Sequence, residues 1–289
     1  MKSFGVRFYR GVVGNGDASG RNVSDLLTEL ANYHDEDKQL PQLEVGQLIN
    51  ELRELAVSNT GSVIQGVLAL VRDDAPHIRQ ADGRERPIVL QEQEGVLEKN
   101  YFLYFVDQQL LVWQVNGRAS HISRFERYLT ELSGLNIKFL DILQEGAFKR
   151  IKDGMIKSLR FRVAKRKNAE AVSPDDWESD AFEMMSSAEA TIIDIKVSTR
   201  RRSKGLLGGL STTVHRMLNR DDVSALQVQL NGEKEPIDLL ADCITDRIQV
   251  EMHGHYPVPK DILHQLSQAK DRQKFALEAV LGAGDKILE

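Results

Sequence analysis

The sequence predicts an α+β protein with mixed or antiparallel sheets, packed helices in two subdomains and a long C-terminal helix. Three observations lead to this fold class. Short β-rich runs bounded by turn residues recur along the 289 residues, helical patterns lie between them, and a long helical pattern ends the chain. The 41% of hydrophobic and 28% of charged residues are the balance of a globular protein with a buried core.

The N-terminal half predicts a strand at residues 4–9 and then a helix from about Ser24, which we expect to be the N-cap. A second helix is expected at residues 48–57 and a strand at residues 63–71. Residues 72–87 predict a loop because proline and glycine interrupt them.

The clearest local pattern is a hairpin, in which two apolar runs flank residues 107–109. Continuously apolar strands are typical of a central sheet position covered on both faces. A helix over Ser120–Leu132 follows, with Ile122, Phe125 and Leu129 on one face and a stop at Ser133 and Gly134. We expect the domain boundary here, which gives an N-terminal domain of residues 1–117 and a C-terminal domain of residues 118–289.

The C-terminal half alternates short strands with helices. The expected strands span residues 137–142, 159–164, 191–197, 223–230 and 248–252, and the expected helices span residues 174–188, 207–218 and 261–281. The final helix carries a narrow apolar stripe. This stripe predicts packing on its own domain, with a dimer contact as the alternative.

Charge is segregated along the chain, although the net charge is only −5. Residues 147–168 hold nine basic residues and one acid, and residues 195–220 hold seven basic residues and no acid. Residues 169–194 hold eight acids and no base. Two basic segments in an otherwise acidic chain indicate contacts with an anionic partner, for which nucleic acid is the best candidate.

Two local patterns support a phosphate-binding surface. Arg160 and Arg162 alternate with apolar residues and therefore share one face of a strand. Four basic residues between positions 200 and 204 precede the helix at 207–218, where cations are unfavourable unless an anion binds. The predicted nucleic-acid-binding residues are Lys157, Arg160, Arg162, Lys165, Arg166, Lys167, Arg200, Arg201, Arg202, Lys204 and Arg216.

Two alternatives remain open. Asp175, Asp194 and Lys196 loosely match the spacing of metal-dependent nucleases of the PD-(D/E)xK type, although Asp175 also fits the first turn of a helix. The basic and acidic segments could instead pair within the chain or between subunits, without nucleic acid. We assign no catalytic residue, metal ligand or cofactor from the sequence, because no established catalytic motif is present.

Three other residues have side chains of reactive or metal-binding types. His253 and His255 would share a face of a strand, but a third ligand is not evident and surface histidines are the expected reading. Cys243 lies among apolar residues, which favours a small buried side chain over a nucleophile.

No segment has the pattern of a signal peptide or a membrane span, so we expect a cytoplasmic protein.

The order of these features resembles the RexA family of prophage exclusion proteins and a broad bacterial and prophage family, and more distantly the KwaB phage-defence proteins. The resemblance lies in VSDLLTEL, ISRFERYLTEL, LRFRVAKRK and IDLLADCITDRIQVEMHGHYPVP before the terminal helix, and it covers nearly the whole chain. It implies a homodimer that binds DNA without sequence specificity in phage exclusion, together with a membrane-protein partner. No catalytic motif comes with the resemblance.

Overall fold

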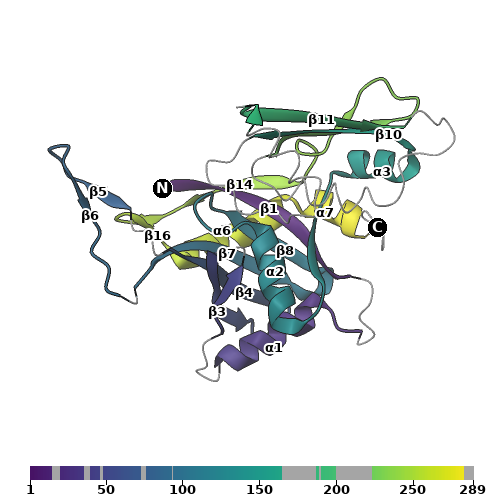
Figure 1. Ribbon diagram of the computed structural model, residues 1–289. Coiled ribbons are helices and arrows are strands. Elements are labelled where there is room, and N and C mark those ends of the chain that lie inside the picture. The colour runs from purple at the N-terminus through teal and green to yellow at the C-terminus, as the bar shows by residue number, and fades with distance from the viewer. Residues whose placement is uncertain are drawn as a thin grey trace. The chain divides into compact units, whose positions relative to one another are not determined.

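The computed structural model of the chain is shown in Figure 1. It describes residues 1–14, 20–35, 40–45, 48–72, 76–92, 94–164, 187–188, 190–199 and 223–282. The chain forms two compact units. Unit 1 comprises Met1–Val6, Gly11–Phe139 and Arg247–Ala269, and unit 2 comprises Arg7–Arg10, Leu140–Asp246 and Lys270–Glu289. The boundary expected at residues 117/118 therefore falls inside a continuous segment of unit 1.

The larger sheet has eight strands in the order β14-β1-β8-β7-β4-β3-β2, and β9 pairs with β1 off this path. Its strands are β1 (Lys2–Val13), β2 (Leu43–Val45), β3 (Leu48–Val57), β4 (Val63–Arg72), β7 (Val96–Phe105), β8 (Leu110–Val115), β9 (Ile137–Asp141) and β14 (Thr245–Val250). The run from β2 through β3, β4 and β7 to β8 is antiparallel. With the helices described next, this confirms the expected α+β class.

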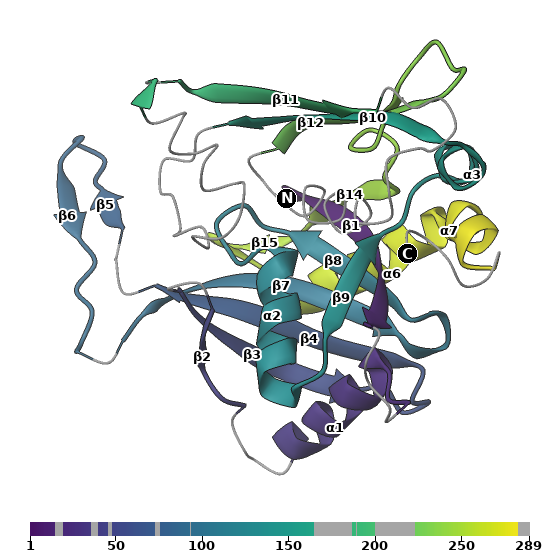
Figure 2. The same cartoon turned by 45° about the vertical axis from the view of Figure 1, so that its right-hand side comes forward.

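The helices are α1 (Val23–Asp35), α2 (Ile122–Ser133), α3 (Glu145–Asp153), α6 (Pro259–Arg272) and α7 (Lys274–Leu281). Helix α2 lies across the sheet in both ribbon views (Figures 1 and 2). Its Phe125 stacks on Phe139 at a centroid distance of 5.2 Å and contacts Phe102 and Trp113 at 5.0 and 5.5 Å. This aromatic cluster fixes α2 on the central strands of unit 1.

The expected hairpin is confirmed as β7 and β8, joined by a single 3₁₀ turn, η1 (Val106–Gln108). Gln109 closes the turn with a φ of 49°. Residues 101–104 and 110–113 are all buried, so both faces of these central strands are covered, as their apolar sequence predicted.

The helix expected at residues 48–57 is wrong, because this segment is β3, hydrogen bonded between β2 and β4. Arg53 pairs with Val67 and Ala56 with Gln65, so two residues of β3 face Gly66 alone. Glu54, with a φ of 52°, belongs to this bulge. The extra residue puts Leu52 and Leu55 three positions apart on one face of the strand, which imitates helical spacing.

Three other expectations need correction. Helix α1 is capped by Asn22, whose Oδ1 accepts a hydrogen bond from the Asp25 amide at 3.0 Å, and not by Ser24. The final helix begins at Pro259 and is divided at Gln273 into α6 and α7. Residues 72–87 hold a short hairpin of β5 (His77–Arg79) and β6 (Glu85–Pro87).

The second sheet belongs to unit 2 and has the order β11-β10-β12-β13, with every pair antiparallel. Its strands are β10 (Ile156–Ala164), β11 (Ile192–Ser198), β12 (Val223–Leu230) and β13 (Ile237–Asp238). The first three confirm strands expected from the sequence. The helix expected at residues 207–218, and the one at 174–188 apart from residues 187 and 188, lie outside the described residues.

Candidate nucleic-acid interface

Strand β10 has one apolar face and one charged face. Leu159, Phe161 and Val163 are at most 4% exposed and pack beneath the sheet. Arg160 and Arg162 alternate with them, and their side chains are 45% and 43% exposed. The alternation follows directly from the twofold period of a strand, so the sequence LRFRV places both arginines on the open face.

The antiparallel register extends this open face across three strands. Arg160 lies beside Lys196 of β11 and Gln227 of β12, and Arg162 lies beside Asp194 and Ala225. Directly paired residues of antiparallel strands point to the same side of a sheet. We call this surface the polar face; its members are Arg160, Arg162, Asp194, Lys196, Ser198, Ala225, Gln227 and Gln229.

Asp194 joins the two arginines of the polar face. Its carboxylate accepts hydrogen bonds from Arg160 Nε at 2.9 Å and Nη2 at 2.6 Å. It also accepts hydrogen bonds from Arg162 Nη2 at 2.9 Å and Nε at 3.3 Å. The hydrogen bonds from Arg160 and Arg162 hold the pKa of the Asp194 carboxyl well below its usual range, and the same carboxylate raises the pKa of Arg160.

The polar face keeps a positive balance after this pairing. Among the described residues of this face, three cations, Arg160, Arg162 and Lys196, accompany one carboxylate, that of Asp194. Arg160 uses only Nε and Nη2 on Asp194, so its Nη1 has no hydrogen-bond partner among the described residues. These groups match the charge and hydrogen-bonding needs of phosphate oxygens.

The structure brings together part of the predicted site. Arg160 and Arg162 lie on β10, within the strand expected at residues 159–164, and Lys157 lies on the same strand, which begins at Ile156. Lys165, Arg166, Lys167, Arg200, Arg201, Arg202, Lys204 and Arg216 lie outside the described residues. Sequence reasoning did not assign Lys196, Gln227 or Gln229 to this surface, because only the pairing register shows that they adjoin the arginines.

The nuclease alternative depends on Asp194 as a metal ligand, yet this carboxylate is already hydrogen bonded to two guanidinium groups. A divalent cation there would have to displace both arginines or sit beside their charges. Asp175, the other acid of that motif, lies outside the described residues. Across the described part of the chain, no three histidine, cysteine, aspartate or glutamate residues form a group that could hold a metal ion.

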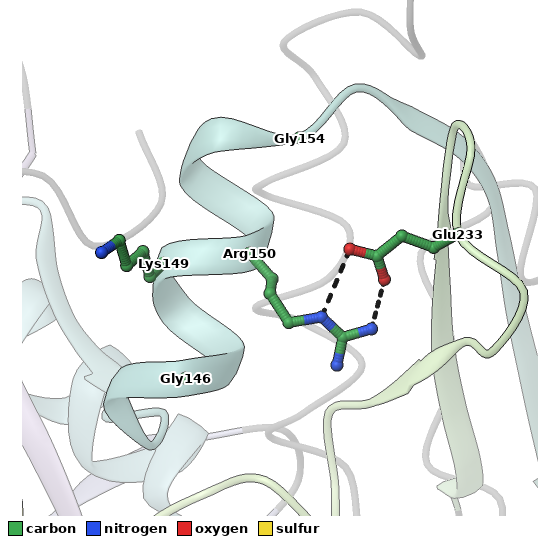
Figure 3. A pocket seen from close by; sticks show the side chains of 5 residues that line it. All are labelled: Gly146, Lys149, Arg150, Gly154 and Glu233. Atoms are coloured by element: carbon green, nitrogen blue, oxygen red, sulfur yellow. Dashed lines mark hydrogen bonds and ion pairs between the residues drawn. The ribbon is translucent and has the colours of Figure 1, made fainter.

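A second basic feature of unit 2 is neutralised in a similar way. Arg150 of α3 forms a two-point ion pair with Glu233, which follows β12; Arg150 Nε lies 3.4 Å from Glu233 Oε1 (Figure 3). The Arg150 side chain lowers the pKa of Glu233, whose carboxylate in turn raises the pKa of Arg150. The pair lines a shallow pocket of about 350 Å³ together with Gly146, Lys149 and Gly154.

The two histidines and the cysteine considered in the sequence occupy positions that do not form a reactive or metal-binding site. His253 ends β15 (Met252–His253), and His255 lies beyond the turn at Gly254, so the two histidines do not share a strand. Cys243 is 4% exposed, and its thiol donates to the Leu239 carbonyl at 3.1 Å. Burial raises the pKa of this thiol, as expected for an unreactive side chain.

The fold and this surface define an α+β protein whose smaller sheet presents a charged face. Residues 65–273 match the model of a family of unknown function, DUF6731, and the chain therefore belongs to that family. A search of curated proteins found no match. In the described residues, no helix is long and apolar enough to cross a membrane.

Proposed function

We propose that the protein binds nucleic acid without sequence specificity, by contacting phosphates through the polar face of β10, β11 and β12. The observation that carries the proposal is the side-by-side arrangement of Arg160, Arg162 and Lys196 on an open sheet surface. In a chain of net charge −5, such a surface concentrates positive charge where an anionic polymer can approach.

The chemistry of the polar face favours the sugar-phosphate backbone over the bases. The described strands of this face offer guanidinium, ammonium, amide and hydroxyl groups, and none of its members is aromatic. Proteins that bind single strands commonly stack bases on aromatic side chains, whereas phosphate contacts use the groups present here. We therefore expect duplex DNA to bind with little dependence on its sequence.

The first test is fluorescence anisotropy of a labelled DNA duplex titrated with the full chain over a series of salt concentrations. Each phosphate contact contributes about −0.9 to the slope of log affinity against log salt. Contacts from the three cations of the polar face, Arg160, Arg162 and Lys196, predict a slope of roughly −3. If the duplex does not bind even at low salt, the proposal is wrong.

The matched variants are R160Q/R162Q and R118Q/R127Q. Both remove two positive charges, but Arg118 and Arg127 are exposed residues of unit 1, whereas the polar face belongs to unit 2. We expect R160Q/R162Q to reduce the slope by about 2, and R118Q/R127Q to leave it nearly unchanged. Equal effects of the two variants would indicate that net charge, and not this surface, drives binding.

A second candidate function is pairing between basic and acidic surfaces of two protein chains. It is favoured by one observation: Asp194, a member of the acidic segment, already occupies the two arginines. Sedimentation over the same salt series separates the candidates. Dimers that dissociate with salt, in a protein that does not bind DNA, would support protein pairing.

The resemblance to RexA and KwaB proteins supports a role in phage defence or prophage exclusion, in the cytoplasm, as a homodimer with a membrane-protein partner. The test is phage plating on bacteria that express the chain with its neighbouring genes. We expect protection that R160Q/R162Q abolishes and R118Q/R127Q retains. Full protection by R160Q/R162Q would mean that the defence role does not depend on the polar face.

A further inference from the structure

A separate element of unit 1, the hairpin of β5 and β6, has no core of its own. It forms a two-stranded sheet in which each strand pairs only with the other. All residues from 76 to 87 are exposed. In both views the hairpin projects away from the strands of the larger sheet in its unit (Figures 1 and 2). We call residues 76–87 the arm.

An isolated two-stranded hairpin is marginally stable in water because it buries little apolar surface. The arm therefore contributes little to the stability of unit 1, and its side chains are available for a partner. A protein partner would require apolar side chains to bury. The arm offers one large apolar side chain, Ile78, which is 36% exposed.

The charged side chains of the arm are mainly arginines. The arm holds three arginines, Arg79, Arg84 and Arg86, and two acids, Asp82 and Glu85. Arg84 Nε lies 3.4 Å from Asp82 Oδ2. Arg79 and Arg86 form no ion pair with any described residue. Two guanidinium groups that form no ion pair with a carboxylate of the described residues, on a projecting element of an acidic chain, match an anionic partner better than an apolar one.

The register directs these two arginines to opposite sides. Arg79 pairs with Glu85, and Arg86 pairs with Ile78, so the two guanidinium groups leave opposite faces of the ribbon. A two-stranded ribbon fits the major groove of B-DNA, which is about 12 Å wide. A ribbon that enters this groove edge-on presents one face to each wall, so in that orientation the two arginines would reach phosphates of both strands.

From these observations we propose that the arm enters the major groove of duplex DNA and contacts both of its walls through Arg79 and Arg86. The inference rests on the proposed function, because it names a second contact of the same ligand. It adds a requirement that the polar face does not: the ligand must be double-stranded. A single strand has no groove for a ribbon to enter.

The test is anisotropy with the R79Q/R86Q variant on a DNA duplex and on a single strand of the same length. We expect the salt slope on the duplex to fall by about 2, and the affinity near 0.1 M salt to fall about ten- to fifty-fold. On the single strand, R79Q/R86Q should bind like the wild-type protein. The R118Q/R127Q variant is the control for net charge, since all four arginines lie in unit 1.

The outcomes distinguish this inference from the proposed function. If R160Q/R162Q lowers the slope and R79Q/R86Q behaves like R118Q/R127Q, the arm is not a DNA contact and the polar face stands. Equal losses on duplex and single strand would overturn groove entry. A change of sedimentation mass in R79Q/R86Q would assign the arm to a second copy of the chain instead.

Discussion

The two sheets of this protein use the twofold period of a strand in opposite ways. In β7, four consecutive residues, 101–104, are buried, so both faces of the strand lie in the core of the larger sheet. In β10, buried Leu159 and Phe161 alternate with open Arg160 and Arg162. The first pattern produces a central structural strand, and the second leaves one face for a ligand.

The two sheets also differ in what their polar side chains bind. In the larger sheet, Asn100 Nδ2 donates to the Gln114 carbonyl at 3.0 Å, and Gln114 Oε1 accepts from the Tyr101 amide at 3.0 Å. These buried side chains complete hydrogen bonds of the backbone. In the smaller sheet, Arg160 and Asp194 bond to each other at the surface, where either partner can exchange for another ion.

The largest expected effect tests the structural role of the larger sheet. Phe125 is fully buried and contacts three other aromatic rings, so Phe125→Ala should lower the free energy of unfolding by about 3–5 kcal/mol. The measurement is urea unfolding followed by circular dichroism. The same substitution at Phe275, which is 85% exposed, should change the stability by less than about 0.5 kcal/mol. Similar losses at both positions would contradict the assigned core.

Much of the fold could be predicted because its signals are local. The apolar runs of β7 and β8 and the amphipathic pattern of α2 are continuous in the sequence and match the structure. The β3 prediction failed because the bulge at Glu54 replaced a period of two with a spacing of three. That conformation depends on pairing with β4, which no local pattern reports.

The candidate site shows the same limit. The shared face of Arg160 and Arg162 follows from their spacing alone, and it was predicted. Their pairing with Asp194, more than thirty residues away in the chain, depends on the register between β10 and β11. Residues 147–168 hold nine basic residues and residues 169–194 hold eight acids, so sequence patterning cannot select Asp194 among the eight as the partner.

A smaller effect tests whether Asp194 competes with DNA for the two arginines of the polar face. Asp194→Asn keeps the side-chain shape but removes the charge that occupies both arginines, so DNA affinity should rise about two- to five-fold by anisotropy. Lowering the pH to about 4, where an ordinary aspartate is half protonated, should not imitate this variant through Asp194, because the arginines hold the pKa of its carboxyl below the ordinary value. Weaker binding by Asp194→Asn would mean that the carboxylate orients the guanidinium groups for the ligand.

The smallest effect concerns the response of the two sheets to alkaline pH. Burial raises the pKa of Tyr101 and of Tyr128 to about 12, whereas β10, β11 and β12 contain no tyrosine. A raised tyrosine pKa means that the folded state favours the neutral phenol. The stabilisation is therefore complete below the unfolded value of about 10 and is lost as the pH rises through 12.

We expect the free energy of unfolding, measured by urea titration at successive pH values, to decline above about pH 10. The Y101F/Y128F variant should show a shallower decline, because two of the phenols that ionise late have been removed. Tyr128→Phe also loses the hydrogen bond that the phenol donates to the Pro41 carbonyl at 2.8 Å, so the comparison is made between slopes and not between absolute stabilities. An identical slope in the variant would show that these two phenols ionise alike in the folded and unfolded states, and would place them outside the dry interior that distinguishes the larger sheet.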